Sequence, residues 1–210
     1  MLLIFDWDGT LIDSSEKIIT CMQRAAETCG LPALQERQVK NIIGLGLPEA
    51  IHTLFPGVDE AGRENFRAHY ATHYLEADRI PCRFFPGVMD TLQQFKEDGH
   101  TITIATGKAR RGLDRILGNM ALLDFFHASR CSDETRSKPH PQMLHELLQQ
   151  FSCAPEAALM IGDTTFDMEM ARVAAVPRVA VSYGVHDVER LKNFSPLAVI
   201  DHFPELTKHV

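Results

Sequence analysis

The sequence predicts an α/β protein, with a doubly wound parallel-sheet (Rossmann-like) core and an inserted all-helical cap domain. Three features of the 210 residues lead to this prediction. Short apolar runs alternate with amphipathic stretches, which is typical of a parallel sheet covered by helices. The stretch from residue 14 to residue 80 shows only helical patterns. Polar residues repeatedly follow the apolar runs, at the strand ends where such sheets bind ligands.

The first predicted strand, Leu2–Phe5, is a run of four apolar residues, as expected of a short buried strand. It leads into Asp6-Trp7-Asp8-Gly9-Thr10, which places two carboxylates two positions apart. Carboxylates this close repel each other, and burial makes the repulsion costlier unless a cation or a shared proton relieves it. Mg²⁺ is such a cation, because it prefers carboxylate, water and phosphate oxygens. An acidic turn that caps the next helix is the structural alternative.

The region after the first motif is predicted to be helical. Glu16–Cys29 carries an apolar stripe with helical spacing. The remaining helices expected in this region are Gln38–Ile43, Leu47–Phe55 and Glu60–Ala77. No strand-like run interrupts them, so we expect a cap of residues 14–80 and a core of residues 1–13 and 81–210.

The chain returns to an alternating pattern after a linker over Ile80–Pro86, which holds two prolines and two phenylalanines. The expected strands are Thr101–Ala105, Phe125–Arg130, Ala157–Ile161, Arg178–Val181 and Leu197–Ile200. The expected helices are Val88–Asp98, Arg110–Met120, Pro141–Phe151 and Phe166–Ala175, with a last helical turn near Pro204–Lys208. Strands that alternate with helices run parallel, so their carboxyl ends share one edge of the sheet.

Residue types suited to phosphate and metal binding recur at that edge. Thr106-Gly107-Lys108 follows a strand and opens a helix, so a hydroxyl and backbone N–H groups are available to phosphate oxygens. Lys138 stands in a Ser-Lys-Pro-His stretch just before another helix. Asp163 and Asp167, four positions apart, follow a further strand. The sequence therefore predicts one site that draws on four separate segments.

Each motif also has a structural alternative. Asp163 and Asp167 can simply start a helix, whose dipole favours acidic residues. Thr106-Gly107 can be an ordinary turn between a strand and a helix, and a lysine before a proline can be merely exposed. The ordered combination of all four motifs favours the functional interpretation.

With these motifs in this order, the chain resembles the haloacid dehalogenase-like hydrolase superfamily. It is most similar to the phosphoglycolate phosphatase-like branch, which has a helical cap after the first strand. The resemblance covers essentially the whole chain. It implies that Asp6 is the nucleophile that forms an aspartyl-phosphate while its other oxygen binds Mg²⁺. It also implies that Asp8 is the general acid and base, and that the backbone carbonyl of Asp8 is a metal ligand.

The resemblance assigns roles to the remaining motifs as well. Thr106 and Gly107 match the phosphate-binding segment of the second motif, and Lys138 matches the cation that stabilises nucleophile and phosphate. Asp163 matches the acidic metal ligand of the fourth motif. Asp167 is expected to orient metal-bound waters or Lys138 from outside the metal's own ligand set.

The implied activity is Mg²⁺-dependent hydrolysis of a small soluble phosphomonoester, phosphoglycolate-like or a sugar phosphate. A phosphomutase of the β-phosphoglucomutase kind and a pyrophosphatase remain alternatives. Halide displacement is disfavoured, because the dehalogenases that resemble this family lack the second acid, which is present here as Asp8. The substrate itself cannot be named from the sequence, and the protein can be a monomer or a homodimer.

Composition indicates which partners and compartment to expect. The net charge is −7 and there is no Lys/Arg run, which argues against nucleic acid and anionic membrane as partners. Five cysteines form no C-x-x-C pair, which favours free thiols in a reducing compartment. No apolar run approaches the roughly 18 residues of a membrane span, and no signal peptide is visible. A cytoplasmic protein is expected.

Several polar residues are ambiguous at this stage. Lys108 and Arg111 are expected to be solvated charges at a helix start rather than phosphate ligands. His69 and His73 have the i, i+4 spacing of metal ligands but no matching acidic or thiol partner, so a solvated helix face is favoured. The turn Gly44-Leu45-Gly46 can lie over the active site or can merely connect two helices.

The segment between the first strand and the cap is the expected hinge for opening and closing. It contains Asp13 and Ser14. Asp13 can be a helix cap or a functional group, and Ser14 or Ser15 can cap the helix that follows.

Overall fold

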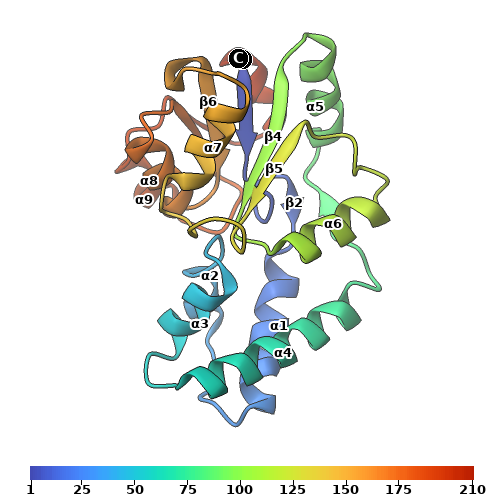
Figure 1. Ribbon diagram of the computed structural model, residues 1–210, viewed down its shortest axis with the longest axis vertical. Helices are drawn as coiled ribbons and strands as arrows, with labels where there is room; N and C mark the ends of the chain where they lie inside the picture. Colours follow the sequence, from blue (N-terminus) through green and yellow to red (C-terminus); the bar gives the residue numbers. More distant parts are fainter.

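The computed structural model describes residues 1–210. Its central element is a six-stranded parallel sheet in the order β5-β4-β1-β6-β7-β8 (Figure 1). The strands are β1 Leu2–Phe5, β4 Thr101–Thr106, β5 Ala128–Cys131, β6 Ala158–Gly162, β7 Arg178–Val181 and β8 Ala198–Ile200. The strand order grows outward from β1 in both directions, so the predicted doubly wound core is confirmed.

Helices cover both faces of this sheet. They are α5 Val88–Glu97, α6 Arg110–Asn119, α7 Gln142–Gln150, α8 Thr165–Val173 and α9 Val188–Lys192, with short 3₁₀ helices at Pro155–Ala157 and Phe203–Lys208. Leu3 and Phe5 of β1 pack in one apolar cluster with residues of α5 and α6. Leu2 and Ile4 pack in a second cluster with residues of α7 and α8. Successive side chains of a strand point to opposite faces, and both faces of β1 are buried, which explains its uniformly apolar sequence.

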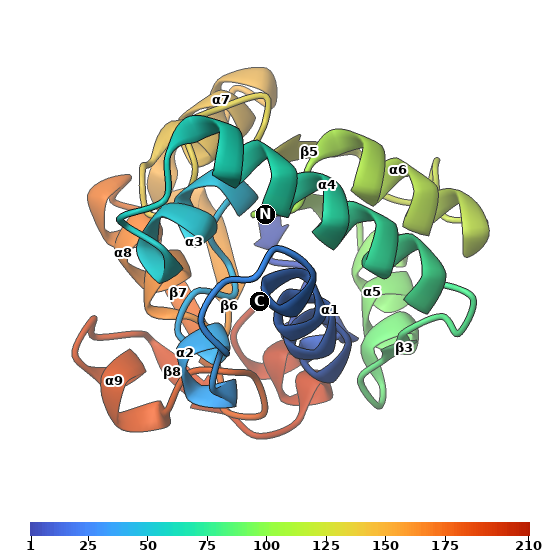
Figure 2. The ribbon, with the colours of Figure 1, turned by 90° about the horizontal axis from the view of Figure 1, so that it is seen from below.

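Four helices between β1 and β4 form a separate layer, which we call the helical insertion. They are α1 Ser15–Thr28, α2 Glu36–Lys40, α3 Leu47–Leu54 and α4 Glu60–Ala77. The insertion lies beyond one end of the sheet (Figure 1), and α4 crosses it along its length (Figure 2). The rings of Phe55 and Phe66, 5.4 Å apart, join α4 to the end of α3. The all-helical character predicted for this region is confirmed, whereas the boundaries at residues 13/14 and 80/81 stay a prediction.

A two-stranded antiparallel ribbon joins the insertion to the core, and the sequence did not predict it. It consists of β2 Ile12–Asp13 and β3 Arg83–Phe84. The second of these strands lies within Ile80–Pro86, where only a linker was expected. Strands of two residues are too short to give a periodic pattern.

The predicted bounds of the strand Phe125–Arg130 were wrong, because β5 begins three residues later, at Ala128, and ends at Cys131. Phe125 and Phe126 are apolar for another reason. Their rings pack against each other at 5.2 Å, and the ring of Phe126 lies 6.0 Å from that of Trp7. Helix α9 was not predicted, because five residues hold too little of a helical period.

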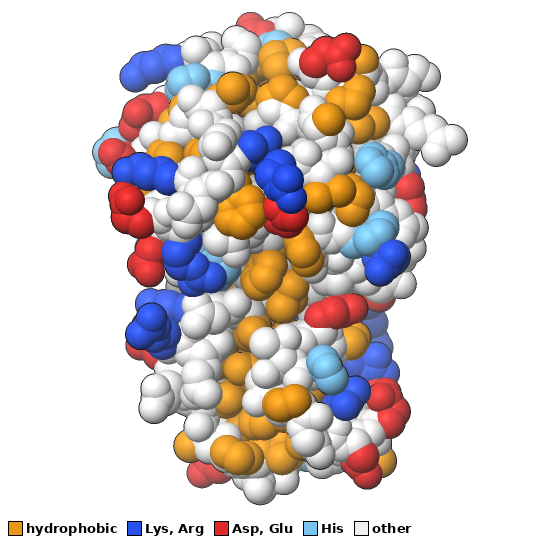
Figure 3. All heavy atoms as spheres, turned by 90° about the vertical axis from the view of Figure 1, so that its left-hand side faces the viewer, with side chains coloured by type: hydrophobic (Ala, Val, Ile, Leu, Met, Phe, Trp, Pro, Cys, Tyr) orange, Lys and Arg blue, Asp and Glu red, His pale blue; other side chains and the backbone are white.

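Charged side chains of both signs are mixed on the surface drawn in Figure 3. On that face, Lys and Arg side chains are interspersed with Asp and Glu and form no continuous basic patch. No helix combines the length and the apolar character that crossing a bilayer requires.

The central strand should dominate stability. Leu3 is fully buried in β1, whereas Leu123 is 58% exposed. We expect Leu3→Ala to lower the free energy of unfolding by about 2–5 kcal/mol, because it leaves a cavity in a close-packed core. Leu123→Ala, the matched control, should change it by about 0.5 kcal/mol or less. Urea unfolding followed by circular dichroism measures both, and equal effects would contradict this account of the core.

Candidate active site

The site forms where three neighbouring strands end. Phe5, the last residue of β1, is level with Ile104 of β4 on one side and Ile161 of β6 on the other. The residues that follow these strands therefore emerge next to one another. Asp6 stays tied to β6 through its backbone N–H, which donates to the carbonyl oxygen of Ile161 at 2.9 Å. The parallel sheet thus brings together at one edge the motifs that the sequence holds apart.

Lys138 lies at the centre of a buried ion-pair cluster. Its Nζ is 2.5 Å from Oδ1 of Asp6 and 2.6 Å from Oδ1 of Asp167. The other oxygen of Asp167 accepts hydrogen bonds from the backbone N–H and the hydroxyl of Thr164. All three charged side chains are at most 1% exposed. Lys138 is therefore held in one position between two carboxylates.

This cluster holds less positive than negative charge. Carboxylate oxygens of Asp6, Asp163 and Asp167 lie within 4.8 Å of one another, and Lys138 supplies one positive charge against their three negative ones. Burial raises the pKa of Asp6 well above its usual value despite the nearby Lys138. Burial, followed by the charge of Asp167, raises the pKa of Asp163 to about 7. With all three carboxylates ionised, two further positive charges would balance the cluster.

A divalent cation fits this donor set. Oδ2 of Asp6 is buried and has no hydrogen-bond partner, although an unpaired buried oxygen is costly. Three carboxylates within reach of one point are ligands that Mg²⁺ prefers. The side chain of Asp8 lies outside this group, so only its backbone carbonyl is left for the metal role expected of it. Asp6 and Asp163, with Asp167 nearby, are the side chains that could hold the ion.

Asp163 is held by residues from two other segments. Its Oδ1 accepts from the hydroxyl of Thr10 at 2.9 Å, and its Oδ2 accepts from the backbone N–H of Val185 at 2.8 Å. Gly9 has a φ of +91°, and a Cβ there would lie 2.3 Å from Oδ2 of Asp163. A Cβ on Gly184 would lie 2.1 Å from Cβ of Asp163. Both positions therefore require glycine, which accounts for Gly9 in the first motif.

Asp8 has its own set of partners. Its Oδ1 accepts a hydrogen bond from the hydroxyl of Ser14 at 2.8 Å, and its Oδ2 lies 3.1 Å from Nζ of Lys108. Ser14 occupies the N-cap position of α1, but its side chain makes no capping bond. The expectation that Lys108 is solvated was wrong, because its side chain is only 10% exposed. Arg111, by contrast, is exposed as expected.

Thr106 and Gly107 lie at the end of β4, beside β1. Thr106 is buried, and its hydroxyl accepts from the backbone N–H of Lys108 at 3.1 Å. A Cβ on Gly107 would lie 2.5 Å from the carbonyl oxygens of Gly44 and Leu45. The turn of the helical insertion connects α2 with α3 and also sits directly on the phosphate-binding segment that the sequence predicts.

The same turn also contacts the segment that carries Lys138. The backbone N–H of Gly46 donates to the hydroxyl of Ser137 at 2.7 Å. Ser132, at the start of that segment, donates from its hydroxyl to the carbonyl oxygen of Gly107 at 2.6 Å. The insertion and two core loops thus meet at one point beside the buried ion pairs.

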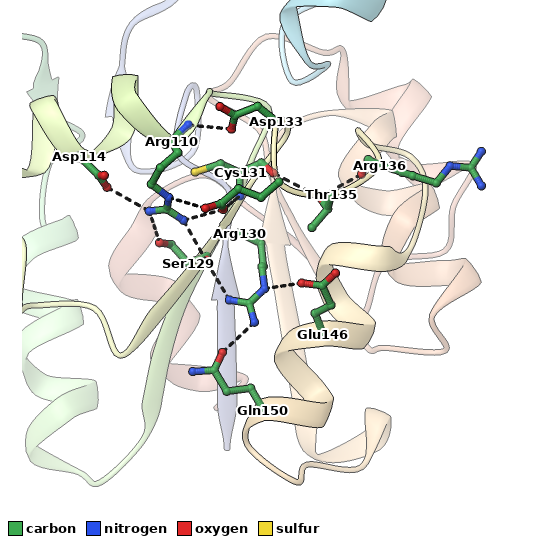
Figure 4. Close-up of polar contacts among 11 residues, drawn as sticks. Arg110, Asp114, Ser129, Arg130, Cys131, Asp133, Thr135, Arg136, Glu146 and Gln150 are labelled. Carbon is green, nitrogen blue, oxygen red and sulfur yellow. Dashed lines mark hydrogen bonds and ion pairs between the residues drawn. The ribbon is translucent and has the colours of Figure 1, made fainter.

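A surface network anchors the start of the Lys138 segment (Figure 4). Arg110 opens α6, and its guanidinium donates to Glu134 at 2.8 and 2.9 Å and to the hydroxyl of Ser129 at 2.8 Å. The backbone N–H of Arg110 donates to Asp133 at 2.8 Å. Because this arginine joins a strand, a helix and a loop, it restrains the loop that leads to Lys138.

The histidine pair forms no metal site. The group of three carboxylates above is the only cluster of potential ligands in the structure. Nε2 of His73 lies 3.2 Å from the hydroxyl of Thr28 and its Nδ1 lies 3.9 Å from Glu76, but neither histidine belongs to a group of three potential ligands.

Comparison with known proteins gives the family. The model of the haloacid dehalogenase-like hydrolases matches residues 3–181. The chain belongs to this family. "Probable phosphatase IndB" of Dickeya dadantii is 30% identical over 209 residues, which are 98% of this chain and 91% of that protein. A phosphoglycolate phosphatase of Nitrosococcus oceani is 31% identical over 211 residues, covering 98% of this chain and 94% of that protein.

Solved structures agree with the family. One from Bacteroides fragilis, described as a haloacid dehalogenase-like hydrolase, has a TM-score of 0.88 at 28% identity and covers 98% of both chains. The predicted family and branch are thus confirmed, and with them the prediction that this hydrolase is an enzyme of the phosphatase type.

Sequence reasoning missed several residues of this hydrolase's site. Gly184 and Val185 follow β7 and reach Asp163, so the same rule of looking beyond strand ends would have found them. Ser137 directly precedes Lys138. Lys108 was weighed and set aside, because a lysine near a helix start is commonly solvated. Its position immediately after Thr106-Gly107 was the available indication.

The buried ion pairs of Lys138 should contribute far more to stability than a surface ion pair of similar length. Lys138→Met leaves two buried carboxylates without their counter-charge, and we expect a loss of about 3–5 kcal/mol in the free energy of unfolding at pH 7. Lys192 pairs with Glu189 at 2.7 Å, but both side chains are more than half exposed. Lys192→Met, the matched control, should cost under about 1 kcal/mol. Urea unfolding measures both, and a small loss for Lys138→Met would contradict the assigned charge balance.

Proposed function

We propose that this hydrolase is a Mg²⁺-dependent phosphatase that cleaves a small soluble phosphomonoester through an aspartyl-phosphate on Asp6. The observation that carries the proposal is the buried cluster around Lys138, which lacks two positive charges and leaves Oδ2 of Asp6 without a partner. A phosphoryl group needs a nucleophile and concentrated positive charge at one place. The cluster offers a carboxylate nucleophile and a site for that charge.

In this proposal the residues divide the chemistry between them. Mg²⁺, held by Asp6, Asp163 and the backbone carbonyl of Asp8, would supply positive charge against the phosphoryl oxygens. One oxygen of Asp6 attacks phosphorus, and the bond from phosphorus to the leaving oxygen breaks. Lys138 pairs with Asp6 and stabilises both the nucleophile and the phosphoryl group. Asp167 holds Lys138 in place.

Asp8 is proposed to move the protons. It gives a proton to the leaving oxygen in the first step, and it takes one from the water that hydrolyses the aspartyl-phosphate in the second. Its hydrogen bond to Ser14 links it to the first residue before α1. Thr106 and the backbone N–H of Gly107 would bind phosphate oxygens.

The helical insertion is proposed to act as the cap, formed by residues 14–80 on a core of residues 1–13 and 81–210. Its turn at Gly44–Gly46 lies on Gly107 and Ser137, so it can exclude bulk water and limit the size of the substrate. The substrate class is proposed from relatives that include phosphoglycolate phosphatases and N-acetylmuramic acid 6-phosphate phosphatases. All five cysteines are free, which supports a cytoplasmic location.

The carboxylate substitutions test the covalent route. We expect Asp6→Asn and Asp8→Asn each to lower turnover at least about a thousandfold, because each removes a group that takes part in bond breaking. A panel of phosphomonoesters with Mg²⁺, read by release of inorganic phosphate, identifies the substrate and provides the assay. Asp124→Asn, at an exposed position, is the control. Substantial turnover by Asp6→Asn would rule out the aspartyl-phosphate, and activity that requires a bisphosphate activator would favour a mutase.

Metal binding should depend on pH through Asp163, whose pKa is raised to about 7. Below that pH the metal-free folded protein holds a proton there, which the ion must displace. We therefore expect Mg²⁺ to raise the melting temperature more at pH 8 than at pH 6. Without metal, the stability contribution of this group is present at low pH and is lost as the pH rises through about 7.

Thermal unfolding with Mg²⁺ or with EDTA, at both pH values, measures these effects. Asp163→Asn should lose most of the Mg²⁺-dependent shift, whereas Asp124→Asn should retain it. An equal Mg²⁺ shift at both pH values in the unaltered protein would show that Asp163 does not control binding.

A further inference from the structure

Lys108 is a buried cation whose role the proposed mechanism leaves open. Its Nζ lies 3.1 Å from Oδ2 of Asp8, 3.3 Å from the hydroxyl of Tyr74 and 4.8 Å from the centre of that ring. Lys108 belongs to the core, just after β4, while Tyr74 belongs to α4 of the helical insertion. Burial alone would lower the pKa of Lys108, but Asp8, with smaller contributions from Tyr70 and Asp78, outweighs it and the pKa is raised. The side chain is therefore a charged group between the two layers.

The leaving group of any substrate must come close to this charge. A general acid works within about 2.6–3.2 Å of the oxygen that it protonates. Since Lys108 contacts Oδ2 of the same carboxylate, a leaving oxygen that is protonated from Oδ2 lies within about 6 Å of Nζ when the two hydrogen-bond lengths are added, and the atoms bonded to it lie next to that point. The phosphoryl side of the site is served by Lys138, which is already shared between Asp6 and Asp167.

Other cations near this part of the insertion are already paired. Lys17 lies 2.9 Å and Arg115 2.7 Å from the carboxylate of Asp78. The remaining wall is aromatic, since the rings of Tyr70 and Tyr74 pack 5.7 Å apart. Burial raises the pKa of both tyrosines well above the usual value, so their hydroxyls stay neutral. Lys17 and Arg115 share a carboxylate outside the proposed chemistry, whereas the partner of Lys108 is the proposed proton donor Asp8, so Lys108 is the cation linked directly to that donor.

The contact with Lys108 also limits what Asp8 can do. Oδ1 of Asp8 accepts from Ser14, and Oδ2 is occupied by Lys108. A carboxyl group that is to give a proton to the leaving oxygen needs one oxygen free of such a contact. On the Oδ2 side the ion pair must therefore open before Asp8 can act as an acid.

We propose that Lys108 is the specificity-determining residue of this hydrolase. When a short phosphomonoester carries a second negative charge on its leaving-group side, Lys108 moves away from Asp8 and pairs with that charge. Such a substrate gives Lys108 a replacement partner and frees Asp8 in the same movement. A substrate with an uncharged leaving group offers no replacement, so the ion pair persists and proton transfer is slow. The inference rests on the proposed phosphatase function and names the substrate class of that site.

Matched substrates test the proposal. The probes are phosphoglycolate, with a carboxylate; ethane-1,2-diol bisphosphate, with a second phosphate; and 2-hydroxyethyl phosphate, with neither. We expect the unaltered enzyme to prefer at least one charged probe over the neutral one by about tenfold to a hundredfold in kcat/KM, as for a charge-assisted hydrogen bond. In Lys108→Met that ratio should fall to within about threefold of unity, and Lys108→Arg should retain part of it.

The ratio of kcat/KM between charged and neutral probes separates specificity from damage to the fold, because a loosened insertion would slow the hydrolysis of all three probes alike. Arg111→Met removes an exposed cation three positions away and should leave the ratio unchanged. A neutral probe cleaved as well as both charged ones, or discrimination that survives in Lys108→Met, would overturn the inference while leaving the phosphatase function intact. A protein that hydrolyses none of the phosphomonoesters would overturn both.

Discussion

The need to pair one buried ammonium group with several buried carboxylates is the constraint on which the rest of this structure depends. Lys138 contacts Asp6 and Asp167 at 2.5 and 2.6 Å where water is excluded. Buried charges are tolerated only when they are paired and hydrogen-bonded, so the surrounding segments must be placed accurately. Thr164 fixes Asp167, Thr10 and Val185 fix Asp163, and the sheet itself fixes Asp6. The remaining deficit of positive charge makes the site receptive to a cation.

The second carboxylate of the first motif works in a different environment. Asp8 is turned toward Ser14 and Lys108 rather than toward the buried cluster. Its neighbours belong to the boundary between the sheet core and the helical insertion, where Tyr74 contacts the same lysine. Two aspartates separated by one residue therefore experience two electrostatic settings. This separation matches the different tasks proposed for them, because Asp6 is to attack phosphorus beside Lys138 and a metal ion, whereas Asp8 is to exchange a proton.

The sequence predicted the elements whose patterns are long or chemically unusual. The central strand was predicted residue for residue, since four apolar residues before two acids have few alternatives. The motifs that converge at the sheet edge were also identified, because parallel strands must bring their ends together. What remained hidden depends on tertiary contact. The start of β5 was misplaced because Phe125 and Phe126 are apolar but pack against the core from a loop. The burial of Lys108 depends on α4, a helix of the other layer.

The ribbon of β2 and β3 has a mechanical consequence. Both connections between the sheet core and the helical insertion pass through it, and they are hydrogen-bonded side by side, with Ile12 opposite Phe84 and Asp13 opposite Arg83. Two separate tethers would let the layers slide or twist past each other, but a paired ribbon mainly bends across its own plane. A displacement of the insertion that keeps this pairing intact must therefore move both connections together, because neither strand can shift along the other without breaking the pairing.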